Sequence, residues 1–286
     1  MPSVTLDPLD GTAPLVLDWT ADSGAFITDA PLGLELAPRV LVTRPRMVGD
    51  GVDVDRVVVT ERDITVPLHV HGPTRADYLA KRRRLQDIVA ARRSVRVVHT
   101  EDDGEQLSID GWYVGGMDGG GVDSDGDSWS SYAVVLRCGD PFWRMSQRTE
   151  PWRLDEAADW FPFPDLVLRS SLITARRTVA NPGNVDSWPL WTVTGPGNRL
   201  DIKHWGTGRR IEYSLPIATG QVVRIDTRPG SRSVTDAAGV NLMPAIATDP
   251  EFWPLQGGGN DIELTMPAAS DDSDVSLTWV PLRESV

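Results

Sequence analysis

Two histidines, His69 and His71, have a spacing that could bind a metal ion. They stand two residues apart in the segment 64–71, where apolar and polar residues alternate. Alternation with a period of two predicts a strand, so both imidazoles would lie on the same face. A zinc site needs three or four ligands, and no third ligand is apparent beside the pair. We therefore interpret the two histidines as side chains on a strand face and predict no metal there.

Three aspartates, Asp123, Asp125 and Asp127, have the every-second-residue spacing of a calcium-binding loop. In such a loop the sixth position is a glycine and the twelfth is a bidentate glutamate. Counted from Asp123, those positions hold Ser128 and Val134. We interpret the segment as the polar tip of a long hairpin and leave calcium binding open as an alternative.

The patterns of the common catalytic classes are absent from this sequence. It has no Gly-x-Ser-x-Gly elbow, no His-Glu-x-x-His helix and no phosphate-binding loop. Glycosidases need two carboxylates that face each other across the substrate. This sequence has many acidic residues, and no motif around them singles out one such pair. The one cysteine, Cys138, ends an apolar strand-like run and is interpreted as a small buried hydrophobe. The sequence therefore predicts a protein that is not an enzyme and binds no cofactor.

The charge balance of the chain is strongly acidic. Its 286 residues carry a formal net charge of −13, and most of the excess lies in residues 1–165. Nucleic-acid binding needs clustered basic side chains that contact phosphates, so we expect no sequence-specific nucleic-acid partner. No apolar run approaches the length of a membrane span, so we expect no membrane partner either.

The composition predicts a mainly β fold in two domains. The 22 prolines and 26 glycines are spread along the chain, which favours short strands joined by turns. We place a β-rich domain at residues 1–165 and a β-sandwich at residues 166–286. The link between them, at 144–180, is rich in aromatic residues and proline. Candidate strands of the second domain alternate in period two, as in 261–266.

One helix is predicted, over residues 74–93. Thr74 is its candidate N-cap, and Asp77 stands three residues later, as in a capping box. The apolar residues that share one face at helical spacing are Tyr78, Leu85, Ile88 and Val89. The capping signal and the apolar stripe both predict a helix that packs against the sheet of the first domain.

The opposite face of this helix is basic. Its cationic residues are Lys81, Arg82, Arg83, Arg84, Arg92 and Arg93. One interpretation is contact with the acidic surface of a neighbouring subunit, and the other is a solvated face. As candidates for a subunit interface we name Arg82, Arg83, Arg84 and Arg93.

The order of these features resembles that of a known family. A β-rich block with a basic helix ends in Asp140-Pro-Phe-Trp143. An Asn181-Pro-Gly-Asn184 turn follows, with Trp188-Pro189 after it, and then a β-sandwich. This order is similar to that of the distal tail proteins of siphoviruses, the long-tailed phages with non-contractile tails. The resemblance covers nearly the whole chain.

The resemblance implies a structural protein of the phage virion. In this family the first domain forms a ring, usually a hexamer, at the tip of the tail tube, and the second is a galectin-like sandwich. The expected partners are further copies of the chain, the tail tube protein, the tail-associated hub protein of the tip and the tape measure protein. Such a protein is made in the host cytoplasm. The hairpin tip at 115–130 is expected to reach a neighbouring subunit.

The resemblance also suggests an alternative function. A galectin-like domain could bind carbohydrate on the host surface, as a baseplate module. The sugar-binding signature of galectins is absent, and the segment from His204 to Arg209 resembles it only weakly. Trp205 is the one carbohydrate candidate, because a flat indole face suits a sugar ring. We prefer a core or interface role for Trp205.

Overall fold

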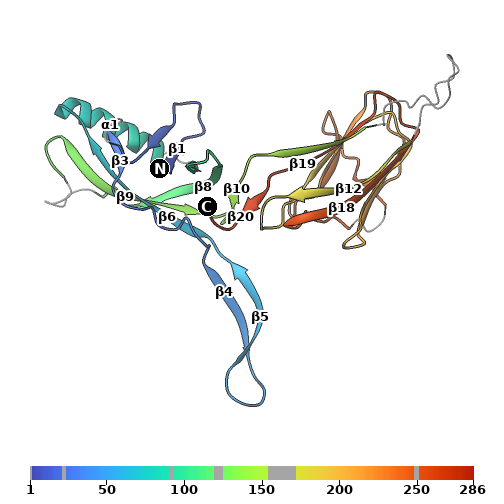
Figure 1. Ribbon diagram of the computed structural model, residues 1–286, viewed down its shortest axis with the longest axis horizontal. Coiled ribbons are helices and arrows are strands. Elements are labelled where there is room, and N and C mark those ends of the chain that lie inside the picture. Colours follow the sequence, from blue (N-terminus) through green and yellow to red (C-terminus); the bar gives the residue numbers. More distant parts are fainter. Residues whose placement is uncertain (1, 21–23, 91–92, 119–124, 154–171, 248–250) are drawn as a thin grey trace. The chain divides into compact units, whose positions relative to one another are not determined.

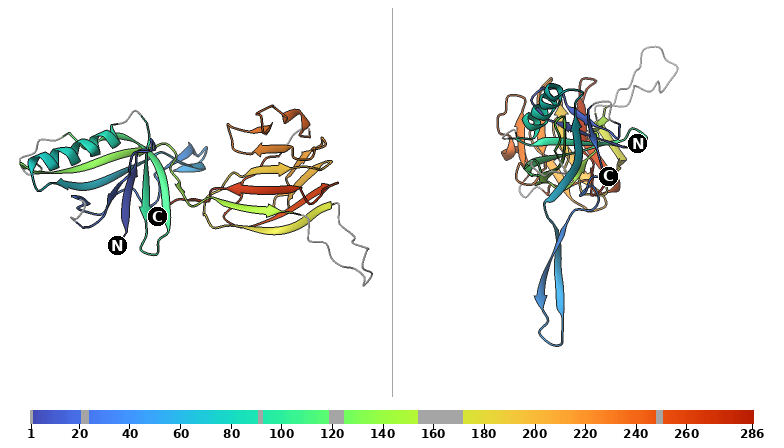
Figure 2. Two further views of the ribbon diagram at one scale, coloured as in Figure 1. Left: turned by 90° about the horizontal axis from the view of Figure 1, so that it is seen from above. Right: turned by 90° about the vertical axis from the view of Figure 1, so that its left-hand side faces the viewer.

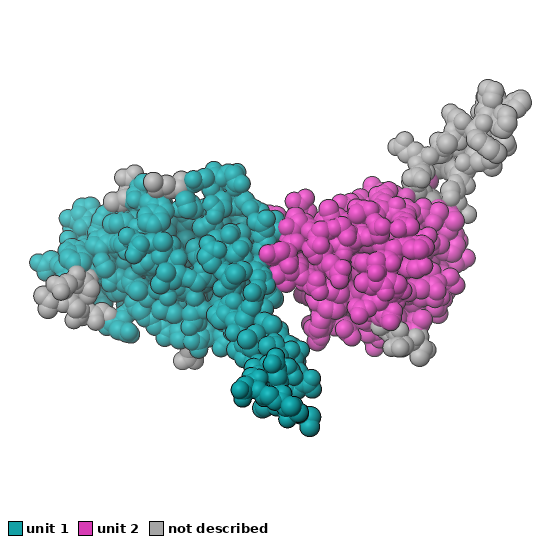
Figure 3. Space-filling view, turned by 60° about the horizontal axis from the view of Figure 1, so that its bottom comes forward, with its two compact units in different colours: residues 1–145, 283–286 teal, residues 146–282 magenta. Residues whose placement is uncertain are grey.

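The computed structural model describes residues 2–20, 24–90, 93–118, 125–153, 172–247 and 251–286. It has two compact units (Figure 3). Unit 1 comprises Met1–Met145 and Arg283–Val286, and unit 2 comprises Ser146–Leu282. Strands dominate both units, and the described residues contain a single α-helix, so the predicted fold class is confirmed. The described part of the chain contains no helix long and apolar enough to cross a membrane.

Unit 1 is built on a nine-stranded sheet with the main order β2-β1-β7-β8-β9-β6-β3 (Figure 1). All its pairings with a given register are antiparallel. Its strands are β1 (Ser3–Asp7), β2 (Leu15–Leu17), β3 (Ala25–Ile27), β6 (Arg62–His71), β7 (Val95–Thr100), β8 (Gln106–Gly115), β9 (Trp129–Cys138), β10 (Trp143–Arg144) and β20 (Leu282–Arg283). Alternation places Ile64, Val66, Leu68 and Val70 of β6 on one fully buried face, as predicted.

The helix α1 (Arg75–Val89) covers one face of this sheet (Figure 1). Its start is confirmed, because the Thr74 side chain accepts a hydrogen bond from the Asp77 amide at 3.2 Å. Its buried face is also as predicted. Its end is not at residue 93. Ala90 is the C-cap, since the chain must become extended for β7, which begins at Val95.

A two-stranded ribbon, β4 (Arg39–Pro45) and β5 (Val52–Val59), also belongs to unit 1. Within the described residues each strand pairs only with the other. The ribbon leads away from the sheet, on the side opposite α1 (Figures 1 and 2). At about 3.3 Å per residue, its strands extend about 25 Å.

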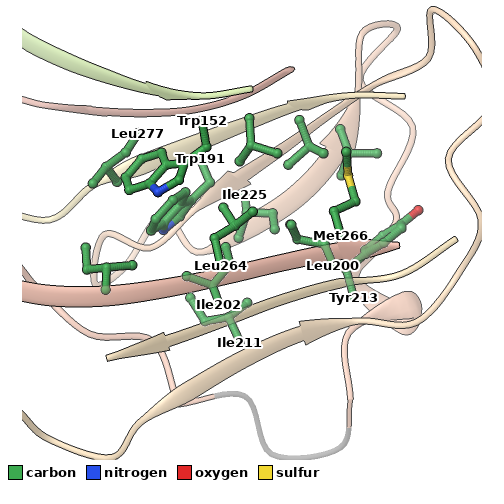
Figure 4. Close-up of a cluster of buried hydrophobic side chains, with 14 of the residues drawn as sticks. Trp152, Trp191, Leu200, Ile202, Ile211, Tyr213, Ile225, Leu264, Met266 and Leu277 are labelled. Atoms are coloured by element: carbon green, nitrogen blue, oxygen red, sulfur yellow. The ribbon is translucent and has the colours of Figure 1, made fainter. Parts of the chain in front are cut away.

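Unit 2 is a sandwich of two antiparallel sheets with the orders β11-β19-β13-β16-β17 and β12-β18-β14-β15. The strands of the five-stranded sheet are β11 (Arg148–Trp152), β13 (Leu190–Thr194), β16 (Val222–Asp226), β17 (Ser233–Asp236) and β19 (Asp274–Trp279). Those of the four-stranded sheet are β12 (Leu172–Asn181), β14 (Leu200–His204), β15 (Arg210–Tyr213) and β18 (Gly258–Pro267). Their inward side chains form a dense core (Figure 4). Its centre includes Trp191, whose ring lies 5.6 Å from that of Trp152 and 6.2 Å from that of Trp253.

The two units divide at 145/146, earlier in the chain than the predicted boundary at 165/166. The reason is β11, which pairs along its length with β19 of the sandwich. Trp152 at the end of β11 is 1 % exposed and packs in the core of unit 2. The other aromatic residues of the predicted link, Trp160, Phe161 and Phe163, lie outside the described residues.

The last four residues, Arg283–Val286, return to unit 1 instead of ending in the sandwich. They are held there by Arg62, which is 1 % exposed. The Arg62 guanidinium donates hydrogen bonds to the main-chain carbonyls of Gly33, Leu34, Glu35 and, from its other terminal nitrogen, Glu284. A charged group can be buried in this way because main-chain carbonyls replace its hydration.

Candidate assembly surfaces

The basic residues of α1 do not form one surface. Arg83 and Arg84 are exposed, and Arg84 donates to the carbonyls of Ala13 and Pro14 at 3.3 and 3.1 Å. Arg82 points elsewhere: its Nε is buried without a hydrogen-bond partner among the described residues. Burial raises the pKa of the Tyr132 phenol, and the positive charge of Arg82 acts in the opposite direction on that pKa.

Arg93 lies beyond the end of the helix and forms an ion pair with Asp10. Asp10 also accepts hydrogen bonds from the side chain and the main-chain amide of Thr12. The Thr12 hydrogen bonds, and then the Arg93 guanidinium, lower the pKa of the Asp10 carboxyl from 3.8 to about 2. Arg93 therefore holds the loop between β1 and β2 against the helix end.

A groove of about 630 Å³ runs between α1 and the loop that joins β1 to β2. It is lined by apolar groups of Pro8, Ala13, Ala80 and Ile88 and by the charged side chains of Asp10, Arg83, Arg84 and Asp87. Two of the four predicted interface arginines, Arg83 and Arg84, therefore line this groove. This surface, called the helix groove below, combines apolar and charged side chains.

The ribbon is a second surface, and the sequence analysis did not identify it as one. Its exposed apolar residues are Val40, Leu41, Met47, Val48, Val52, Val54, Val57 and Val58. At its tip, Met47 is 101 % and Val48 is 90 % exposed. Cross-strand ion pairs hold the strands in register, with Arg46 and Asp53 at 3.0 Å. A sequence signal was present, because apolar residues occupy both faces of these strands, unlike those of a half-buried strand.

Trp205, the carbohydrate candidate, lies at the end of β14 and is 43 % exposed. Its indole Nε1 donates to Oε2 of Glu263 at 3.0 Å. Two cations contact its ring: the Lys203 Nζ is 3.9 Å and the Arg176 Cζ is 4.4 Å from the ring centroid. The ring is therefore already held by charged partners, which a stacking sugar would have to displace.

A small polar pocket of about 300 Å³ adjoins these residues on the outer face of the four-stranded sheet. It is lined by Asp201, Lys203, Arg210, Glu263 and Thr265. Two of its charged groups are paired, because Nε and Nη2 of Arg210 donate to the two carboxylate oxygens of Asp201. The hydrogen bonds to Asp201 raise the pKa of the Arg210 guanidinium.

The histidine pair lies on the outer face of β6, as predicted. His69 Nδ1 is 2.9 Å from Ser131 Oγ, and its ring stacks on Trp129 with centroids 5.3 Å apart. Burial, and secondarily the charge of His71, lowers the pKa of His69 and so favours the neutral ring. Among the residues that the structure describes, no three potential ligands are grouped as a metal site. The calcium candidate Asp123 lies outside the described residues.

The short strings that carry the family resemblance form structural clamps. Trp143 is fully buried, and its indole donates to the Leu34 carbonyl at 3.0 Å. Asn181 accepts a hydrogen bond from the Gly183 amide, which closes the turn, and donates to the Leu255 carbonyl at 3.2 Å. These side chains hold main-chain segments together, and so are placed for folding rather than for chemistry.

Comparison with known proteins agrees with this architecture. Residues 182–281 match the family model of the siphovirus-type tail component, C-terminal domain. A crystal structure of the SPP1 Dit protein, described as a paradigm of the hub adsorption apparatus in phages infecting Gram-positive bacteria, matches with a TM-score of 0.70 at 12 % identity. That match covers 99 % of each chain. No match was found among curated proteins.

Two structures of the phage P2 baseplate in its activated conformation, one with Ca and one with Sr, are more distant. Their TM-scores are 0.48 and 0.47, at 9 % and 8 % identity. Each match covers 97 % of this chain and 98 % of the other. The predicted resemblance is confirmed by the SPP1 match and the family model: residues 182–281 are similar to the siphovirus-type tail component, C-terminal domain, and the chain as a whole has the fold of SPP1 Dit.

Proposed function

We propose that this chain is a structural protein of a siphovirus-type tail tip, where copies of it form a ring of six at the distal end of the tail tube. The ring joins the tube to the hub and host-recognition proteins of the tip, and the tape measure protein ends beside it. The protein is made in the host cytoplasm and becomes part of the virion. Its role is assembly, with no reaction and no cofactor.

The observation that carries this proposal is the ribbon of β4 and β5. A monomer rarely exposes a contiguous apolar surface of this kind unless another protein covers it. Both outer edges of the ribbon also present main-chain donors and acceptors that no strand of the described residues uses. A partner chain would satisfy these groups and bury the valines, so the ribbon has the properties of an assembly arm.

The proposed ring requires two different surfaces on each copy. A cyclic assembly repeats one head-to-tail contact until it closes. Unit 1 carries the ribbon on one side of its sheet and α1 with the helix groove on the other. Two unlike surfaces on separate sides of one unit suit such a contact.

Native mass measurement of the purified full chain, with negative-stain images, tests the proposal. We expect a closed ring whose mass is six times that of the chain, 31.3 kDa. A chain that remains monomeric at high concentration, and is absent from the tips of purified tails when probed with a specific antibody, would contradict the proposal. Specific binding of the chain to host glycans would instead favour the carbohydrate-binding alternative.

A further inference from the structure

We propose that Arg283–Val286, called the return segment below, completes unit 1 only when unit 2 has folded, so that only fully folded copies of the chain enter the ring. This inference rests on the proposed ring and adds a condition on its subunits. Unit 1 consists of Met1–Met145 and the return segment, and all of unit 2 lies between them in the sequence. The return segment is therefore the last part of unit 1 to be synthesised.

The main chain of the return segment is bonded to unit 1 at two points. The Glu284 carbonyl accepts a hydrogen bond from the buried Arg62 side chain, and the Val286 amide donates to the Leu34 carbonyl at 3.4 Å. The Val286 side chain also packs against the buried core of unit 1. These contacts join the return segment to β6 and to the loop that precedes the ribbon.

Two ion pairs add side-chain contacts to the return segment. The Glu284 carboxylate pairs with Arg39, the first residue of β4. The Arg283 guanidinium lies 3.4 Å from the carboxylate of Glu105, next to the start of β8. Partly exposed pairs of this kind contribute little stability by themselves. They do fix the position of the return segment, because they join it to two separate parts of unit 1.

The loop that precedes the ribbon depends on these contacts. Its Leu34 carbonyl accepts hydrogen bonds both from Arg62, at 3.2 Å, and from the Val286 amide. The base of the ribbon follows directly, where the Thr60 amide donates to the Pro38 carbonyl at 3.0 Å. Without the return segment, one terminal nitrogen of the buried Arg62 side chain loses its acceptor, which costs free energy. We therefore expect this loop and the ribbon base to open easily until the return segment docks.

Folding of unit 2 favours docking of the return segment. The chain enters unit 2 through β11 and leaves it after β19, and these strands pair with Arg148 opposite Trp279. The amides of Asn184 and Val185 donate to the Leu282 carbonyl at 3.0 and 3.2 Å, which fixes the residue before the return segment. While unit 2 is unfolded, docking requires closure of a loop as long as the whole unit. The entropic cost of that closure grows with loop length, and a folded unit 2 removes it.

Hydrogen–deuterium exchange and native mass measurement on the full chain test the role of the return segment. The double variant Glu284→Lys, Val286→Asp places a like charge opposite Arg39 and a carboxylate against the core of unit 1. We expect the amides of residues 33–39 to exchange at least about tenfold faster, the sandwich to keep its protection, and no ring to form. Ser285→Ala, the matched control in the same segment, should change neither the exchange nor the mass.

A substitution in unit 2 tests the dependence on its folding. Trp191→Ala opens a cavity at the centre of the sandwich core and changes no residue of unit 1. With rising urea concentration, protection of both the sandwich and residues 33–39 should be lost at lower midpoints than in the native chain, and the two midpoints should shift together. Thr192→Ala changes the next side chain of β13, which points away from the core, and should shift neither midpoint.

The outcomes separate this inference from the proposed function. It is overturned if the double variant keeps native exchange at residues 33–39 or still forms rings, or if Trp191→Ala lowers the midpoint of the sandwich alone. Each of these results leaves the proposed function intact. If the native chain forms no ring and is absent from purified tails, the proposed function fails. The exchange measurements on the monomer then still decide whether unit 1 depends on a folded unit 2.

Discussion

The guanidinium of Arg62 donates a hydrogen bond to the main-chain carbonyl of Glu284, a residue 222 positions later in the chain. Three further carbonyls, in the segment 33–35, accept from the same side chain. One buried cation thus joins β6, the loop before the ribbon and the returning C-terminus within unit 1. The chain leaves unit 1 once to build the sandwich, and Arg62 stabilises the end that comes back.

Removing this cation should destabilise unit 1. Arg62→Met removes the donor to the part-buried carbonyls of Gly33, Glu35 and Glu284, and a hydrogen bond to a charged group contributes about 1.5–3 kcal/mol. We expect the free energy of unfolding of unit 1 to fall by at least about 3 kcal/mol, with faster hydrogen exchange in β6 and the last residues. Urea denaturation and hydrogen–deuterium exchange measure both. Arg137→Ala removes an exposed, solvent-screened ion pair with Asp63 on the neighbouring strand and should change the stability far less than Arg62→Met does.

The hydrogen bonds of the Asn181 side chain should likewise stabilise unit 2. Asn181→Ala removes the donor to the Leu255 carbonyl and the acceptor for the Gly183 amide, all in a buried turn. We expect a loss of about 2–3 kcal/mol in the unfolding free energy of unit 2. Asn198→Ala, at an exposed position, should change it by less than about 0.5 kcal/mol. Equal losses in the two variants would show that the clamp has no special role.

Asp10 should titrate at an unusually low pH. Its folded-state pKa of about 2 lies below the unfolded value, so ionisation of this carboxylate favours the folded state above about pH 4. That contribution is lost as the pH falls from about 4 toward 2. Carbon-detected NMR titration of the carboxyl group measures the pKa directly. Thr12→Ala should raise it more than Arg93→Gln does, because the Thr12 hydrogen bonds are the largest cause of the shift.

Trp205 should act as a structural side chain of the outer sheet face. Trp205→Ala removes a hydrogen bond to Glu263 and the contacts with Lys203 and Arg176. We expect a loss of about 1–2 kcal/mol in sandwich stability, from exposed cation–π contacts of about 0.5–1 kcal/mol each. Arg209→Ala, in the same turn, should have little effect. If the native chain binds a glycan on an array and Trp205→Ala abolishes that binding, the carbohydrate-binding interpretation is the correct one.

Several features were predictable from the sequence because their causes are local. The start of α1 depends on Thr74 and Asp77, which are three residues apart and bond to each other. The buried face of β6 follows from alternation, since successive side chains of a strand point to opposite faces. The end of α1 was predicted less well, because it depends on where β7 must begin in order to pair with β1 and β8.

The candidate surfaces depended on contacts between distant segments. The arginines of α1 are neighbours in sequence, yet Arg84 faces the β1–β2 loop while Arg82 acts on Tyr132 of β9. Only the packing of the helix against two different segments separates them. The boundary between the units was misplaced for a related reason, because the pairing of β11 with β19 joins residues more than one hundred positions apart.

By itself, the sequence determined strands with clear alternation such as β6 and β18, where the helix begins and that no familiar catalytic pattern is present, because these follow from neighbouring residues. The tertiary structure alone decided that β4 and β5 stand apart as an exposed ribbon, that a groove opens beside α1 and that the C-terminus returns to Arg62. These features depend on which distant main-chain groups pair. A strand's own residues do not specify its partner when apolar side chains occupy both of its faces.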